Sequence, residues 1–184
     1  MKIKDINAIE ILDSRGIPTV SVEIELLSGD KARGEVPSGA STGSREAIEL
    51  RDNDPKRFNG KGVLTAVNNV NTIIRDAILD KEFESQKQFD DFLISLDGTE
   101  NKSKLGANAI LSCSIAFCKV AALRIGLELF EYIGMIYWDK EYSKDKFHMP
   151  RPQILMMEGG KHGNWATDIQ EYMIVPKANS FETF

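Results

Sequence analysis

The first segment whose residues could bind a ligand or take part in catalysis is the loop at residues 36–43, with the sequence VPSGASTG. Its two glycines and three hydroxyl side chains can bring backbone amides, carbonyls and hydroxyl groups to a phosphate group or to Mg²⁺. The segment is not a P-loop, because no lysine followed by serine or threonine comes after its second glycine. Spacing alone favours an ordinary surface loop.

A second candidate segment, GGKHGN at residues 159–164, places His162 among glycines. His162 has no partner three or four positions further on, so a zinc site is not expected there. Downstream, Glu171 opens an apolar strand, and a carboxylate at a strand end beside a glycine loop can orient a water, a ligand or a metal. Taken singly, the two residues favour a plain loop histidine and a solvent-facing carboxylate.

A third segment, DSRGIPTV at residues 13–20, reads as a turn ahead of a strand. Arg15 could pair with a carboxylate in another domain or another subunit, because a guanidinium binds carboxylates well. The favoured interpretation is that this turn is structural.

Three strands are expected before any helix. Residues 2–12, 18–26 and 31–36 have strand-like patterns, and a Ser-Gly-Asp turn separates the second from the third. The second strand is the clearest, because apolar and polar residues alternate along it. These segments predict a small antiparallel meander.

Helical spacing follows the meander. Apolar residues recur with a period near 3.6 over several segments, and the last long one is apolar nearly all round. Strands first and helices afterwards predict an α+β domain. The expected helices lie at residues 44–52, 63–78, 89–96, 107–125 and 127–133.

The chain is expected to divide after this domain. Residues 1–134 form the α+β domain, residues 135–152 a charged, proline-containing linker, and residues 153–184 the start of a second domain. Two short strands are expected at 153–157 and 171–175, followed by one helical turn near the last residue. Two strands and one turn cannot bury a core by themselves, so the chain is interpreted as cut off inside the second domain.

Composition restricts the class of protein. The 184 residues are 42% hydrophobic and 28% charged, with a formal net charge of −5. This is ordinary for a soluble globular protein and argues against nucleic-acid binding, which usually shows a basic patch. No secretory signal is expected, and residues 107–125 are interpreted as a buried helix rather than a membrane span. Cys113 and Cys118 are expected to be reduced core thiols in a cytoplasmic protein.

The order of six sequence blocks resembles the first part of enolases, and the resemblance covers essentially the whole chain. The blocks are DSRGIPTV at 13–20, VPSGASTG at 36–43, GKGV at 60–63, LGANAI at 105–110, GGKH at 159–162 and QEYMI at 170–174.

The resemblance implies a fold and an activity. Enolases have an N-terminal domain of three strands followed by helices, and then an atypical β/α barrel that begins with two strands. They are lyases of glycolysis and gluconeogenesis that dehydrate 2-phosphoglycerate to phosphoenolpyruvate. A lysine base and two Mg²⁺ ions take part. The complete protein is expected to be a dimer or a higher homo-oligomer.

The resemblance also implies roles for individual residues. Ser41 would ligate the second Mg²⁺, His162 would reach the substrate phosphate, and Gln170 and Glu171 would lie beside the reacting carbon, with Glu171 helping to position the leaving hydroxyl. His162 and Glu171 are therefore the expected catalytic residues. The mobile loop that closes over substrate corresponds to Ser38, Gly39, Ala40, Ser41, Thr42 and Gly43.

The chain departs from the family pattern in two places. Glu158 stands where an asparagine usually precedes the two glycines, and the segment from Tyr137 to Met149 is longer and more charged than usual. The carboxylate ligands of the first Mg²⁺ and the base lysine are expected beyond Phe184, so the chain alone is expected to be inactive. Two alternatives stay open: half of a split enolase, and a stand-alone interaction module.

Overall fold

The computed structural model describes residues 1–39, 43 and 45–177, and it contains two compact units, Met1–Tyr142 and Ser143–Phe184. Each unit is described by itself. Of the predicted site residues, Ala40, Ser41 and Thr42 lie outside the described residues, and so does the helical turn expected at the last residues.

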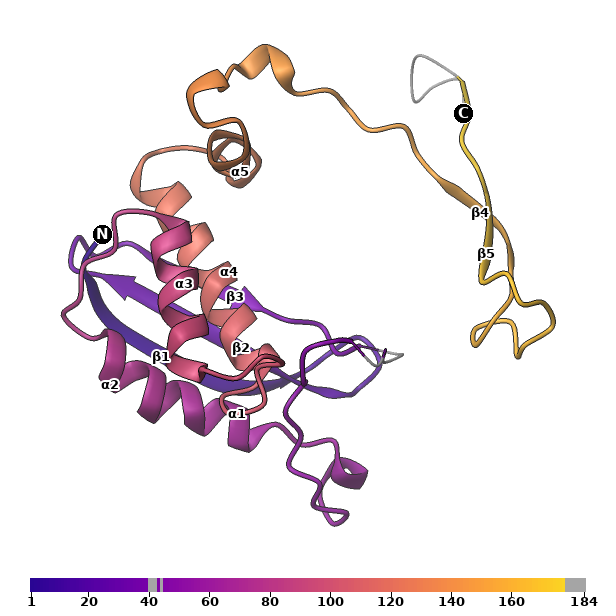
Figure 1. Ribbon diagram of the computed structural model, residues 1–184, viewed down its shortest axis with the longest axis horizontal. Helices are drawn as coiled ribbons and strands as arrows, with labels where there is room; N and C mark the ends of the chain where they lie inside the picture. The colour runs from indigo at the N-terminus through magenta and orange to yellow at the C-terminus, as the bar shows by residue number, and fades with distance from the viewer. Residues whose placement is uncertain (40–42, 44, 178–184) are drawn as a thin grey trace. The chain divides into compact units, whose positions relative to one another are not determined.

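The first unit contains the predicted meander (Figure 1). Strands β1 (Ile3–Leu12), β2 (Pro18–Leu26) and β3 (Lys31–Glu35) form an antiparallel sheet in the order β1-β2-β3. The alternation predicted in β2 is incomplete, because Ser21 is buried although it was placed on the polar face. Helices pack against this sheet, and Thr19 and Ser21 of β2 are buried together with the apolar residues of that strand.

The outer edge of β1 is covered by side chains and by a short segment of backbone. Ile3 exchanges backbone hydrogen bonds with Asp80 and Lys81, and the amide of Asn71 bonds both the N–H and the C=O of Ala8, at 2.7 and 2.9 Å. An uncovered edge strand would offer these groups to another chain. The first half of β1 is thus satisfied within the unit.

The helix expected at 63–78 is continuous but not uniform. It consists of α1 (Leu64–Asn69), a π-helical turn η2 (Val70–Ile74) and α2 (Arg75–Ile78). The π turn contains Asn71, the residue that reaches the edge of β1. Asp52 caps the first turn, since its carboxylate accepts the N–H groups of Leu64 and Thr65 at 2.9 and 2.8 Å.

Two further predicted helices form the centre of the core. Helix α3 (Gln86–Asp97) begins at the Ser85 cap and ends at Gly98 with φ of 71°. Helix α4 (Ala107–Arg124) lies along β2 and β3, and Phe117 stacks on Phe89 with ring centroids 4.2 Å apart. In the described part of the chain, α4 is long and apolar enough to cross a membrane, but 56% of it is buried, as in a core helix.

The end of the first unit differs slightly from expectation. Helix α5 is Leu129–Trp138, longer than the predicted 127–133, and Tyr132 packs it against Ala121 and Ala122 of α4. Both cysteines are free, and burial raises the pKa of the Cys113 thiol. Three single-turn 3₁₀ helices complete the helical elements of the described residues: η1 (Phe58–Gly60), η3 (Asp139–Glu141) and η4 (Lys144–Lys146).

The helix predicted at 44–52 is wrong for the residues that the structure describes there. This segment is extended or irregular, and its backbone groups bond to other segments instead of to each other. Ile48 donates to the carbonyl of Asn101 and accepts from Ala107, while Asp52 donates to Gly62. Long-range partners therefore replaced the local i to i−4 bonds that a helix would need.

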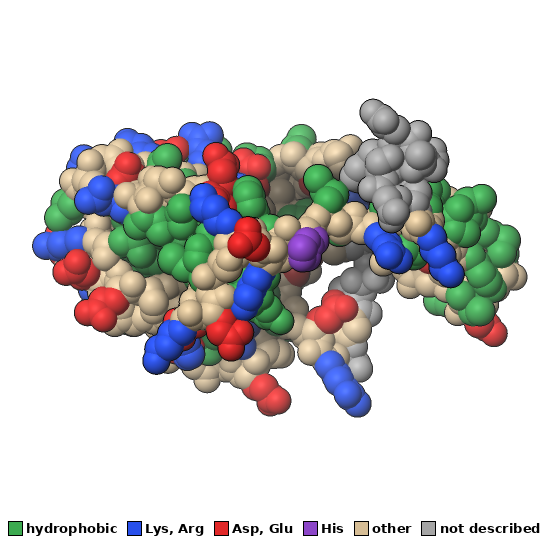
Figure 2. Space-filling model, turned by 90° about the horizontal axis from the view of Figure 1, so that it is seen from above, with side chains coloured by type: hydrophobic (Ala, Val, Ile, Leu, Met, Phe, Trp, Pro, Cys, Tyr) green, Lys and Arg blue, Asp and Glu red, His purple; other side chains and the backbone are tan. Residues whose placement is uncertain are grey.

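The second unit contains β4 (Ile154–Glu158) and β5 (Glu171–Ile174), paired antiparallel. These strands match the two that were predicted. Every described residue of β4 is exposed, including four consecutive apolar side chains at 154–157. Figure 2 shows hydrophobic side chains gathered over this strand pair. The sheet has apolar residues on both faces, and the part of this unit that the structure describes, residues 143–177, contains no α-helix.

Candidate functional site

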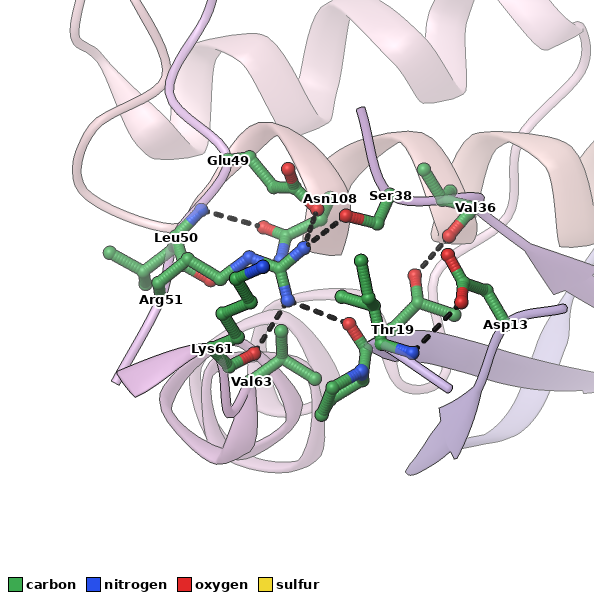
Figure 3. A network of polar contacts seen from close by, with 12 residues as sticks. Asp13, Thr19, Val36, Ser38, Glu49, Leu50, Arg51, Lys61, Val63 and Asn108 are labelled. Carbon is green, nitrogen blue, oxygen red and sulfur yellow. Dashed lines mark hydrogen bonds and ion pairs between the residues drawn. The ribbon is translucent and has the colours of Figure 1, made fainter. Parts of the chain in front are cut away.

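One guanidinium group organises the polar site of the first unit (Figure 3). Nη1 of Arg51 donates to the carbonyl oxygens of Pro18 and Lys61, each at 2.6 Å. Nη2 donates to the Ser38 hydroxyl at 2.6 Å and to a Glu49 carboxylate oxygen at 2.5 Å. Arg51 thereby joins the start of β2, the segment before α1 and the loop at 36–43.

Asn108 fixes the segment that carries Arg51. Its side-chain oxygen accepts the N–H of Leu50, and its side-chain nitrogen donates to the Leu50 carbonyl, both at 3.1 Å. Asn108 lies in the first turn of α4 and is 2% exposed. A buried amide normally needs such partners, so this pair connects the core helix directly to the site.

The predicted structural turn at 13–16 also reaches the loop. Asp13 accepts N–H groups of Arg15 and Ile17 at 2.8 and 2.9 Å, and Gly16 adopts φ of 72°. Hydrogen bonds from these two N–H groups hold the pKa of the Asp13 carboxyl below its ordinary value, and the bond from Ile17 has the largest effect. Arg15 pairs with Asp13 at 3.1 Å and donates to the Ser38 carbonyl at 2.5 Å. Within the described residues, Arg15 thus has partners in its own unit.

A cleft of about 1360 Å³ opens beside the loop. Ser38, Gly39 and Gly43 are among the described residues that line it. Its charged lining carries both signs, from Arg45, Glu46, Glu49, Arg51, Lys61, Glu100 and Lys102. This mixture of charges favours a ligand of neither sign, and Gly39 and Gly43 are exposed at the cleft.

The second unit positions the other predicted residues around one glycine turn. Gly159 donates to the Gln170 carbonyl at 2.7 Å, and Gly160 to that of Thr167 at 2.9 Å. His162 is exposed on the turn that these bonds close, and Gln170 and Glu171 follow directly at the start of β5. A side chain on Gly159 would overlap the carbonyl of Ile169, so this glycine is required by close packing.

Two glutamates of this unit lie opposite each other in the strand pair. Glu158 and Glu171 are directly paired residues in the β4–β5 ladder. Like charges at directly opposite positions destabilise an antiparallel pair. The departure from the family pattern at Glu158 therefore places a second carboxylate beside Glu171.

The described residues do not supply a metal site by themselves. Among residues 1–39, 43 and 45–177, no three His, Cys, Asp or Glu side chains are grouped so that they could hold a metal ion. Ser41, the predicted Mg²⁺ ligand, is outside these residues. A serine alone does not hold Mg²⁺, which is normally bound through carboxylates and substrate oxygens.

Sequence reasoning missed Arg51, Glu49 and Asn108. Arg51 falls in an expected helix that does not form, and Asn108 falls in the expected helix at 107–125 without a role of its own. One signal was present: an asparagine inside a strongly apolar helix must find partners if it is buried. Nothing in the spacing identified Leu50 as that partner.

Comparisons with known proteins agree with the fold. The family model for the N-terminal domain of enolase matches residues 3–133. The chain is 52% identical over 176 residues to Enolase 1 of Chlorobaculum tepidum and 51% identical over 176 residues to Enolase 1 of Entamoeba histolytica. Each match covers 96% of this chain and 39% of the relative, so the chain spans about two fifths of the length of these curated relatives.

Proposed function

The chain belongs to the enolase family through its N-terminal domain, and from this premise we propose that it is part of an enzyme that dehydrates 2-phosphoglycerate to phosphoenolpyruvate. One observation carries the proposal. The match to the two relatives extends over 96% of the chain, well beyond the domain that the family model covers, and so reaches into the unit that holds His162, Gln170 and Glu171.

The geometry of the second unit supports these roles. In the proposal, Glu171 and Gln170 lie beside the reacting carbon, where a carboxylate can organise the proton network of the leaving hydroxyl. His162 reaches the substrate phosphate from an exposed turn that is anchored next to Gln170.

We assign β4 and β5 to the start of the β/α barrel expected after the N-terminal domain. Strands that are covered on both faces carry near-continuous apolar runs, and β4 has one at 154–157. The complete protein would bury these residues and supply the carboxylates that hold Mg²⁺ when it is bound, where the ion stabilises negative charge on the substrate. A cytoplasmic homo-oligomer is proposed for that complete protein.

The test compares the 184-residue chain with the longest polypeptide that the source organism makes from this gene. We expect phosphoenolpyruvate to form from 2-phosphoglycerate with the longer protein and not with residues 1–184 alone. In the longer protein, Glu171→Gln should lower kcat by about 100-fold or more, the range of a lost acid–base group. Lys56→Ala, an exposed residue of the first unit, is the control.

Two outcomes would contradict the proposal. Failure of the longer protein to form phosphoenolpyruvate from 2-phosphoglycerate would overturn the proposed activity. Unchanged activity in the Glu171→Gln variant would remove Glu171 from the site.

A further inference from the structure

One side-chain amide takes the place of a neighbouring strand at the edge of β1. The Oδ1 atom of Asn71 accepts the N–H of Ala8 at 2.7 Å, and its Nδ2 atom donates to the C=O of the same residue at 2.9 Å. A side-chain amide carries the same kinds of donor and acceptor as a peptide group. Asn71 therefore makes with Ala8 the two bonds that a residue of an adjacent antiparallel strand would make.

The helix that carries Asn71 also closes the neighbouring point of this edge. The helix lies beside β1 (Figure 1). Arg75, four residues after Asn71, donates from Nε to Oδ1 of Asp5 at 3.1 Å, and the same oxygen accepts the N–H of Ile6 at 2.9 Å. Residues one helical turn apart thus act on two consecutive outward-facing residues of the strand, Ile6 and Ala8.

Asn71 lies in an unusual piece of helix. In the π turn η2, the N–H of Arg75 bonds the carbonyl of Val70, five residues back. Such turns are rare and often occur where a side chain has a specific role. Val70 and Ile74 of this turn are fully buried, whereas Asn71 is half-buried. The turn therefore packs its apolar side chains into the core while Asn71, beside them, bonds the strand edge.

An open edge at this position would favour association with another chain. β1 is ten residues long, and among the strands that the structure describes it pairs only with β2. Unpaired N–H and C=O groups along a sheet edge are a template for pairing with a further strand, and very short edges avoid this. Closing the edge at Ala8 leaves only residues 9–12 of the strand beyond the closed point.

We propose that Asn71 guards the edge of β1, because its two hydrogen bonds to Ala8 prevent this strand from pairing with β1 of a second copy of the chain. The groups that Asn71 occupies are those that an added strand would use. Two copies of one strand can pair antiparallel about a two-fold axis, so a second copy is the partner that is always available. This role is separate from the proposed enzyme activity and needs no substrate.

The first experiment measures amide hydrogen exchange in the 184-residue chain labelled with ¹⁵N. In the unchanged protein, we expect the Ala8 amide to be protected by Asn71. Asn71→Ala should raise the exchange rate of this amide about tenfold, the loss of one hydrogen bond. The Ile9 amide, in the next residue pair of the β1–β2 ladder, should change only as much as the global stability does. Asn71→Asp keeps an acceptor for the Ala8 N–H and should keep its protection.

The second experiment measures self-association of the same chains by sedimentation velocity over a range of concentrations. Asn71→Ala and Asn71→Asp both free the Ala8 carbonyl and should raise the share of dimers and larger species severalfold. Asn68→Ala, which changes an exposed asparagine of α1, is the matched control and should leave both measurements unchanged. Adding Ile9→Lys at the exposed Ile9 should remove the extra association of Asn71→Ala, because a lysine at a strand edge opposes pairing.

Three results would overturn the proposal. The first is an Ala8 amide that exchanges equally fast in the unchanged chain and in Asn71→Ala. The second is an open edge without association, in which both Asn71 variants stay as monomeric as Asn68→Ala. The third is extra association that persists with Ile9→Lys, since it would belong to another surface. If circular dichroism shows that Asn71→Ala is unfolded, Asn71→Asp decides, because it keeps one of the two bonds.

Discussion

Glu10 shows how a single carboxylate in this protein connects strand, loop and helix. It lies near the end of β1, and its carboxylate accepts hydrogen bonds from both terminal nitrogens of Arg57, the one from Nη1 at 2.8 Å. It also accepts a hydrogen bond from the backbone N–H of Val63 at 2.8 Å. The bond from Arg57 is the largest influence on its pKa, which lies below the ordinary value. Burial opposes this shift but is outweighed. The site arginines are also oriented by a carboxylate together with backbone carbonyls: Arg15 by Asp13 and the Ser38 carbonyl, and Arg51 by Glu49 and the carbonyls of Pro18 and Lys61.

We expect Glu10→Gln to destabilise the first unit by about 1.5–3 kcal/mol at pH 7, the usual contribution of hydrogen bonds to charged groups. The lowered pKa means that the carboxylate stabilises the fold fully above its unfolded pKa of about 4.3. That contribution is lost as the pH falls through the folded pKa. Urea unfolding at several pH values should therefore show the difference between the two proteins shrinking below about pH 4.

The control for this prediction is Glu23→Gln. Glu23 pairs with Arg33 at 2.9 Å on the exposed face of the sheet, where ion pairs contribute about 0–1 kcal/mol. A difference between Glu10→Gln and the unchanged protein that persists undiminished at low pH would contradict the assignment.

At the scale of elements, close approach between β3 and α4 determines how the sheet and the central helix fit. Gly34 of β3 faces α4, and a Cβ atom there would overlap the carbonyl of Ser112 and the amide of Ala116. These obstacles are backbone atoms of a helix, so they cannot rotate away. Glycine is therefore needed at this position for lack of space, not for an unusual φ angle.

Gly34→Ala is expected to cost about 1–3 kcal/mol or more, because overpacking forces backbone shifts. Thermal unfolding of the variant measures this directly. Gly29→Ala is the matched control: Gly29 has open space around its Cβ position but φ of 93°, so its cost comes from backbone strain alone. The close-approach argument fails if Gly34→Ala is as stable as the unchanged protein.

At the scale of the whole molecule, the two units differ in how they bury apolar surface. The main core cluster, from Ile3 to Val120, lies entirely within the first unit. A smaller cluster around Tyr132 joins α5 to α4, and burial raises the pKa of Tyr132 to about 12. The second unit has a strand pair whose apolar side chains are exposed within that unit. The first unit should therefore be stable by itself.

A chain ending at Tyr142 is expected to unfold within about 3 °C of the 184-residue chain, which corresponds to less than 1 kcal/mol. A chain ending at Gly126, which lacks α5 and Tyr132, should be destabilised by about 2 kcal/mol from the lost burial of one large side chain. Calorimetry of the three chains measures both differences. A large loss of stability in the chain ending at Tyr142 would mean that residues 143–184 contribute to the first core.

The sequence by itself determined the meander, the helices at 63–78, 89–96 and 107–125, the strand pair of the second unit and the family. The periodicity of apolar residues indicates which face of an element is buried, and the order of the six sequence blocks indicates the family. Tertiary structure alone decided the path of residues 45–52, the capping of α1 by Asp52, and the assembly of Arg51, Ser38 and Asn108. The physical reason is that a polar side chain's partner lies wherever the fold brings an unsatisfied group, and local spacing carries no record of that position.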